Sequence, residues 1–129
     1  MTRRLISSGS PYEEIIGFSR AVRVGNAISI GGTAPIGPDG STVGIGDAAA
    51  QTHRIMEIVA AALEEAGASL DDIVRTRTML IDIADWEAVA GVRAQYLRAV
   101  RPVDTIVEVA RFVNPEWLLE IEVDAIIDE

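Results

Sequence analysis

The stretch Leu119–Ile126 reads LEIEVDAI, with aliphatic and acidic residues in strict alternation. Successive side chains of a β-strand point to opposite faces, so this pattern predicts a strand with one acidic and one apolar face. A second β-type run, Pro102–Arg111, lies upstream, and a turn at Asn114–Glu116 follows it. We expect the two runs to face each other as a hairpin at the end of the chain.

The pattern upstream predicts four more strands and two helices. The four β-type runs are residues 3–8, 18–24, 27–32 and 73–81. They end at turn residues such as Gly25-Asn26. Asp47 is a good N-cap for a helix that runs to about Ala66, with Gly67 after it. A second helix starts at Asp82 or Asp85, and Pro102 stops it.

The order β-β-β-α-β-α-β-β predicts a single α+β domain over residues 1–129. We expect a two-layer sandwich, with a six-stranded mixed sheet and both helices on one face. The other face of the sheet then stays uncovered and carries both aliphatic and polar residues. Such a face is a candidate for subunit contact, so we expect a closed homo-oligomer.

Composition excludes several classes of function. The formal net charge is -9, and the 11 basic residues form no run, which disfavours nucleic acid as a partner. There is no cysteine and only one histidine, His53, so we expect no metal and no cofactor. No apolar run approaches the roughly 20 residues of a membrane span, and no signal peptide is evident. We therefore expect a cytoplasmic protein without a membrane partner.

A few polar residues could form a site. Asp104 and Glu120 could activate water, and Arg20, Arg75 and Arg77 could bind a carboxylate. Taken alone, each is more often a member of a surface ion pair. His53 is more often a boundary residue than a general base, and Trp117 more often a core residue than a pocket cap.

Several segments resemble the Rid/YjgF family of reactive-intermediate (enamine/imine) deaminases. They are residues 17–33, Gly67–Arg75, Pro102–Arg111 and Glu120–Glu122, and they occur in the family's order. The resemblance implies a chorismate-mutase-like fold. It also implies a homotrimer with a small-molecule cleft between neighbouring subunits.

The resemblance also assigns positions in that cleft. Glu120 matches the glutamate that positions the attacking water, whereas Asp104 stands where the family has the arginine that binds the substrate carboxylate. We expect Glu120 and Asp104 to be catalytic. The expected binding residues are Phe18, Arg20, Gly31, Gly32, Thr33 and Thr105.

The charge reversal at Asp104 leaves two hypotheses open. At about 4 Å and an effective dielectric of about 20, exchanging attraction for repulsion costs several kcal/mol. An enzyme of this type would therefore hydrolyse neutral or cationic imines rather than the usual 2-imino acids. Alternatively, Asp104 pairs with Arg20 or Arg77, and the chain is a non-catalytic module that binds a metabolite or a partner. A ribonuclease activity, sometimes attributed to this family, conflicts with the acidic charge.

Overall fold

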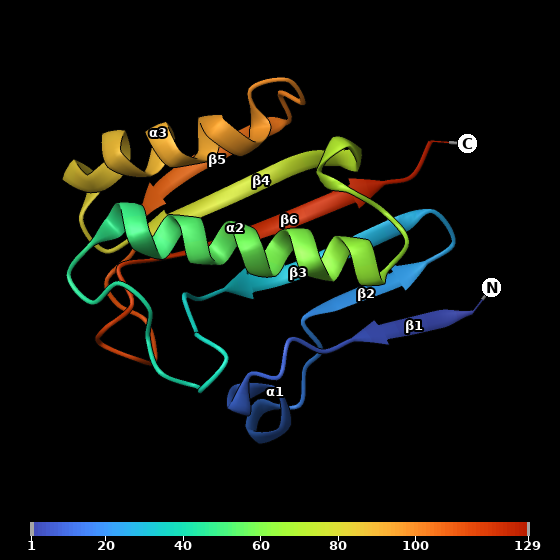
Figure 1. Ribbon diagram of the computed structural model, residues 1–129, viewed down its shortest axis with the longest axis horizontal. Helices are drawn as coiled ribbons and strands as arrows, with labels where there is room; N and C mark the ends of the chain where they lie inside the picture. Colours follow the sequence, from blue (N-terminus) through green and yellow to red (C-terminus); the bar gives the residue numbers. More distant parts are fainter. Residues whose placement is uncertain (1, 129) are drawn as a thin grey trace.

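The computed structural model describes residues 2–128 as one α+β sandwich (Figure 1). The elements are β1 (Arg3–Ile6), α1 (Pro11–Ile16), β2 (Ala21–Val24), β3 (Ala27–Thr33), α2 (Ala48–Glu65), β4 (Ile73–Leu80), α3 (Trp86–Leu97), β5 (Val103–Glu108) and β6 (Leu119–Ile126). The predicted fold class is confirmed, with α2 and α3 on one face of a six-stranded sheet. No helix within residues 2–128 is long and apolar enough to cross a membrane.

The predicted C-terminal hairpin is wrong. The strand order is β1-β2-β3-β6-β4-β5, so β4 lies between the last two strands. β5 pairs with β4 in parallel through the α3 crossover, whereas β6 pairs antiparallel with both β4 and β3. This arrangement gives β6 two neighbours and places its apolar face at the centre of the sheet.

The alternation along β6 places its side chains as predicted. Leu119, Ile121, Val123 and Ala125 are at most 2 % exposed and join the core beneath the helices. The apolar stripe of α2 packs onto them with Ile55, Val59 and Leu63. Full burial of such side chains contributes about 1.5–3 kcal/mol each, so this contact carries much of the stability of the domain.

The opposite face of the sheet is open, as predicted. It carries two ion pairs, Arg77–Glu122 at 2.7 Å and Arg75–Asp124 at 3.9 Å, and exposed aliphatic side chains on β1, β2, β5 and β6. These aliphatic residues are Leu5, Val24, Val103, Val107 and Ile126. The role of this face in subunit contact stays a prediction.

The short helix α1 lies where the sequence suggested only a loop. Ser10 caps it, Pro11 is its first residue, and Glu13 completes a capping box with the Ser10 backbone. Gly17 ends the helix in the left-handed region, with φ of 91°. The sequence Ser-Pro-x-Glu is therefore a signal for the start of this helix. Helix α1 forms one wall of the site described below.

Gln51 ties α2 to two loops. Its side chain is fully buried; its amide donates to the carbonyls of Gly44 (3.2 Å) and Glu116 (2.9 Å) and accepts from the N–H of Leu118 (2.8 Å). All three bonds serve backbone groups of irregular segments, although the Gly44 carbonyl also accepts from the Asp47 N–H at 2.9 Å. Gln51 therefore fixes the point where the chain enters β6.

We expect Gln51→Ala to lower the free energy of unfolding by about 2–4 kcal/mol, because the Glu116 carbonyl and the Leu118 N–H lose their buried side-chain partner. The matched control is Gln95→Ala on the exposed side of α3, expected to stay within about 0.5 kcal/mol of the wild type. Urea unfolding followed by circular dichroism measures both. Equal effects of the two variants would contradict this role.

Candidate functional site

A cavity of about 360 Å³ opens where α1, the end of β3 and the start of β6 meet. Four aromatic side chains line it, Tyr12, Phe18, Phe112 and Trp117, together with the charged side chains of Arg20, Arg111 and Glu120. We call it the aromatic cavity. Its volume lies within the range of about 300–1,000 Å³ that is typical of small-molecule sites.

The aromatic residues of the chain are concentrated here. The whole sequence has two Trp, two Tyr and two Phe, and four of these six residues line this one cavity. Trp117 is 4 % exposed and packs edge-on against Tyr12, with ring centroids 5.2 Å apart. The expectation that Trp117 is a core residue is confirmed, and the same ring also forms part of the cavity wall.

Arg20 is the buried cation of the aromatic cavity. Its Nη1 donates to the carbonyls of Gly32 (2.7 Å) and Gly31 (3.2 Å) and to Thr33 Oγ1 (3.1 Å). Its Nε has no hydrogen-bond partner among residues 2–128, and the guanidinium lies 5.2 Å from the centroid of Phe18. Burial lowers the pKa of Arg20, against the opposing attraction of Glu13 and Glu120.

Glu120 is the carboxylate of the same cavity. Burial raises its pKa; the charge of Arg20 opposes that shift, and Glu122 adds to it. Gly32 lies in the irregular part of the β3–β6 pair, and a Cβ at Gly32 would collide with Glu120 Oε1. The absence of a side chain at Gly32 therefore lets the carboxylate lie against the end of β3.

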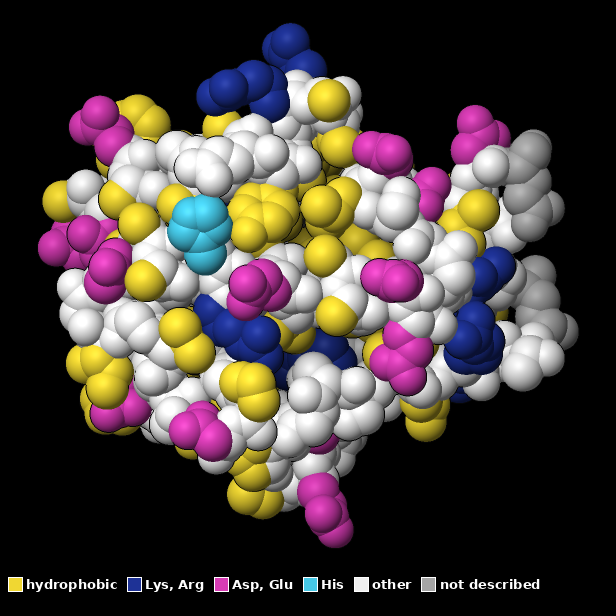
Figure 2. Space-filling model, viewed as in Figure 1, with side chains coloured by type: hydrophobic (Ala, Val, Ile, Leu, Met, Phe, Trp, Pro, Cys, Tyr) yellow, Lys and Arg dark blue, Asp and Glu magenta, His cyan; other side chains and the backbone are white. Residues whose placement is uncertain are grey.

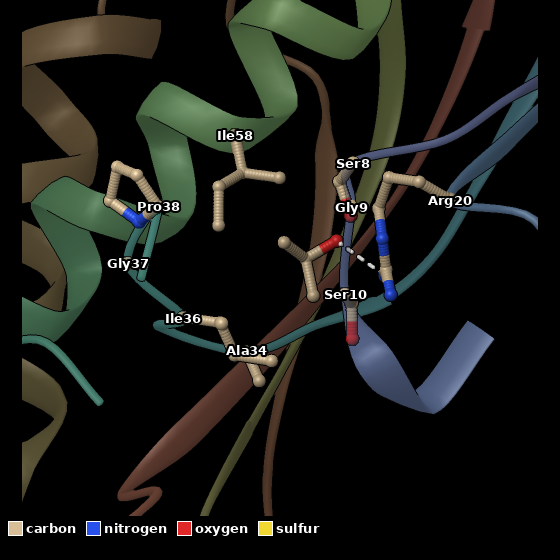
Figure 3. Close-up of a pocket in the computed structure, with 10 residues that line it drawn as sticks. Ser8, Gly9, Ser10, Arg20, Ala34, Ile36, Gly37, Pro38 and Ile58 are labelled. Carbon is tan, nitrogen blue, oxygen red and sulfur yellow. Dashed lines mark hydrogen bonds between the residues drawn. The ribbon is translucent and has the colours of Figure 1, made fainter. Parts of the chain in front are cut away.

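A smaller cavity of about 80 Å³ adjoins the first, and Arg20 lines both (Figure 3). The loop Ser8–Ser10 borders it, and the Glu13 carboxylate accepts hydrogen bonds from the Ser8 N–H, the Ser8 hydroxyl and the Ser10 N–H. Burial raises the pKa of Glu13, but these hydrogen bonds outweigh it and hold the pKa below its ordinary value. Glu13 thus fixes the loop that closes the site behind Arg20.

Asp104 lies on the opposite, helix-covered face of the sheet. Its Oδ1 lies 2.8 Å from Arg93 Nη1 and accepts a hydrogen bond from Thr76 Oγ1 at 2.7 Å. The expected pairing with Arg20 or Arg77 is therefore wrong. Because the side chains of β5 and β6 at these positions point to different faces, Asp104 does not meet Glu120 within one chain.

The other predicted binding residues lie at the two cavities, except for Thr105. Gly32 lines the aromatic cavity and Thr33 lines the small one, while Gly31 contributes its carbonyl to Arg20. Thr105 pairs with Arg77 on the open face, away from the cavity in the same chain. Phe18 and Arg20 lie in the cavity, so the N-terminal part of the predicted site is brought together with Glu120.

Sequence reasoning missed Tyr12, Phe112 and Arg93. Tyr12 and Phe112 lie outside the strands, and the only sequence feature that could have indicated a site there is the small number of aromatic residues in the chain. Arg93 is 9 % exposed on the inner side of α3 and also donates to Thr76 and Thr78. A lone arginine in the apolar stripe of a helix indicates a buried partner, and that signal was available.

Neither His53 nor any metal cluster contributes to the site. His53 is half-buried between α2 and α3, where Nδ1 lies 3.2 Å from the Tyr96 hydroxyl, as expected of a boundary residue. Among residues 2–128, no group of three or more His, Asp or Glu side chains is arranged to hold a metal ion.

The family model described as Endoribonuclease L-PSP matches residues 10–127. The chain belongs to this family. The match spans nearly the whole domain and confirms the resemblance to Rid/YjgF proteins, whose members include RutC.

Individual members of the family are similar over their full length. The crystal structure of Rv2704 from Mycobacterium tuberculosis, a YjgF/YER057c/UK114 family member, is 41 % identical, with a TM-score of 0.88, and the match covers 98 % of this chain and all of that one. A RutC family protein of Pyrococcus abyssi is 36 % identical over 95 % of both chains. The 3-aminoacrylate deaminase RutC of Acinetobacter baylyi is 32 % identical over 91 % of both chains.

We expect Asp104→Ala to destabilise this family member by about 2–4 kcal/mol, because it leaves the Arg93 guanidinium buried without a counter-charge. The matched control is Glu57→Ala, which breaks the exposed Arg54–Glu57 pair on α2 and should cost below about 0.5 kcal/mol. Urea unfolding compares the two. An unchanged midpoint for Asp104→Ala would show that the pair is not a stabilising contact.

Proposed function

We propose that this protein hydrolyses small imines or enamines to carbonyl compounds and ammonia in the aromatic cavity. The observation that carries the proposal is the position of Glu120, a carboxylate with a raised pKa in an apolar cavity next to a buried arginine. The name of the related RutC, a 3-aminoacrylate deaminase, supports the same reaction class.

The reaction needs one proton acceptor that later acts as a donor. An enamine first takes a proton from solvent on carbon and loses one from nitrogen, which makes it an imine. Ionised Glu120 then removes a proton from water as the water oxygen adds to the imine carbon, and the nitrogen takes a proton from solvent, giving a neutral amino alcohol. Protonated Glu120 gives its proton to the leaving nitrogen, the C–N bond breaks, and the hydroxyl releases its proton to solvent, so that ammonia and a carbonyl group form. Glu120 ends as it began, so one water is consumed in each turnover.

We propose a homotrimer as the active form. The open face of the sheet bears the exposed aliphatic residues of β1, β2, β5 and β6, which a second copy would cover. In such an assembly, the outer strand β5 of one protomer could approach the aromatic cavity of its neighbour and complete the cleft. Light scattering should then give a mass of three times 13.8 kDa, and a mass of one chain would contradict the proposal.

We expect Glu120→Gln to lower kcat by about 100-fold or more, because the amide cannot take the proton of water. The wild-type rate should fall as the pH drops through the raised pKa of Glu120, so the acid limb should lie above the ordinary value of 4.5. Ammonia release from imines generated in situ by an amino-acid oxidase measures both. Binding of a ligand without any turnover by the wild type would favour a non-catalytic binding module instead.

Gly32→Ala tests whether the position of Glu120 matters, because the variant keeps the carboxylate and changes only the space beside it. The added Cβ should displace the Glu120 carboxylate and lower kcat at least about tenfold. The unfolding free energy should change by less than about 1 kcal/mol, since the end of a flexible side chain can move. Gly31→Ala is the matched control, because its Cβ would meet no atom within 4 Å. Equal kcat values for Gly32→Ala and Gly31→Ala would show that the position of Glu120 does not matter for the reaction.

A further inference from the structure

We propose that Arg20 is a positioning residue for Glu120. Its buried guanidinium holds the backbone against which the Glu120 carboxylate lies, and its positive charge keeps that carboxylate ionised, ready to take a proton from water. This role rests on the proposed hydrolysis and names how the same site prepares its proton acceptor. It takes the place of the substrate-binding role that the sequence suggested for Arg20.

Arg20 and Glu120 both contact one short piece of backbone, Gly31–Gly32. Arg20 Nη1 donates to the Gly32 carbonyl at 2.7 Å and to the Gly31 carbonyl at 3.2 Å. Glu120 Oε1 lies in the space beside Gly32 that a Cβ would need. The guanidinium and the carboxylate therefore reach the same glycine, and both side chains line the aromatic cavity.

The protein holds the Arg20 guanidinium in one place. Nη1 also donates to Thr33 Oγ1 at 3.1 Å, and the Phe18 ring lies 5.2 Å from the guanidinium. The side chain is only 4 % exposed, and its Nε is buried. Because the planar group cannot swing away, its charge acts on Glu120 from a constant distance.

Arg20 is the cation that opposes the burial of Glu120. Burial raises the pKa of Glu120, the charge of Arg20 lowers it, and Glu122 raises it further. Glu122 is itself bound to Arg77 at 2.7 Å on the open face, which weakens its effect. The other titratable groups that α1 and the cavity wall bring near this pair are Tyr12, Glu13 and Arg111.

An acid–base carboxylate in an apolar cavity has to meet two opposite demands. It must be ionised to take a proton from water, whereas burial favours the protonated form. A fixed arginine offsets the burial without entering the proton transfer, since its guanidinium keeps its own proton at neutral pH. The combination leaves Glu120 ionised when water arrives and still basic enough to hold the proton until the nitrogen leaves.

The buried Arg20 Nε–H allows a test in the wild type that needs no substitution. In 15N-labelled protein its resonance should shift with pH at two midpoints. The lower belongs to Glu13, whose pKa lies below the ordinary 4.5, and the upper to Glu120, whose pKa lies above it. Glu120→Gln should remove the upper midpoint alone. A wild-type resonance without the upper midpoint, or one that keeps it in Glu120→Gln, would overturn the inference.

The charge of Arg20 is then tested by the pH profile of kcat/KM. Arg20→Gln should move the acid limb upward by about one pH unit, because the charge that keeps Glu120 ionised is gone. Arg20→Lys, which keeps a charge, should reverse part of that shift. At pH values above the limb, the KM of Arg20→Gln should stay within about threefold of the wild type.

Two results would contradict the positioning role. The first is an acid limb that stays in place in Arg20→Gln. The second is a KM that rises about tenfold or more at every pH, which would make Arg20 a substrate-binding residue. If a variant fails to fold, the wild-type resonance of Arg20 decides the question by itself.

Arg23→Gln is the matched control for the lost charge. Arg23 is also a half-buried arginine that holds backbone carbonyls, those of Gly25 at 2.9 Å and Ala66 at 2.6 Å, but it does not line the aromatic cavity. Its substitution should leave the acid limb within about 0.2 pH unit of the wild type. Equal shifts in Arg23→Gln and Arg20→Gln would assign the effect to net charge and overturn the inference.

The resonance and the turnover separate this inference from the hydrolysis on which it rests. Ammonia release from imines, with an acid limb that is the same in the wild type and in Arg20→Gln, would overturn the inference and leave the proposed function standing. Linked titration of Arg20 and Glu120 in a protein that releases no ammonia would do the reverse.

Discussion

The packing of β6 beneath α2 is the contact on which the rest of the structure depends. One face of β6 is fully buried by its aliphatic residues, and the period of two then forces Glu120, Glu122 and Asp124 onto the other face. A shift of one residue in register would expose the aliphatic side chains and bury three carboxylates. The energy of the core therefore also fixes the position of the carboxylate to which we assign the chemistry.

The site combines this rigid strand with irregular segments that are fastened by polar contacts. Gln51 holds the loop that leads into β6, Arg20 binds the end of β3, and Glu13 secures the loop before α1. These buried polar groups bond mainly to backbone atoms, which helices and strands leave unsatisfied at their ends. The Nε–H of Arg20 is the one nitrogen of this arrangement that is buried without a partner among residues 2–128.

Local patterns were enough to predict the layers of the fold but not every neighbour. The caps and apolar stripe of α2 and the alternation of β6 are local, and the structure has both as expected. The supposed hairpin failed because chain order does not say whether a crossover inserts another strand, here β4, between two runs. The helix α1 was missed because a capping box in six residues competes with an equally plausible turn.

The sequence by itself predicted the order of helices and strands, the two faces of β6 and the family, and the family resemblance named Phe18, Arg20 and Glu120, which line one cavity in the structure. Only the tertiary structure decided that Asp104 faces away and pairs with Arg93, and that four of six aromatic side chains meet in one cavity. The physical reason is the distance along the sequence over which each kind of interaction acts. Periodicity and capping act over a few residues, whereas ion pairs and cavity walls join residues that folding brings together from distant parts of the chain.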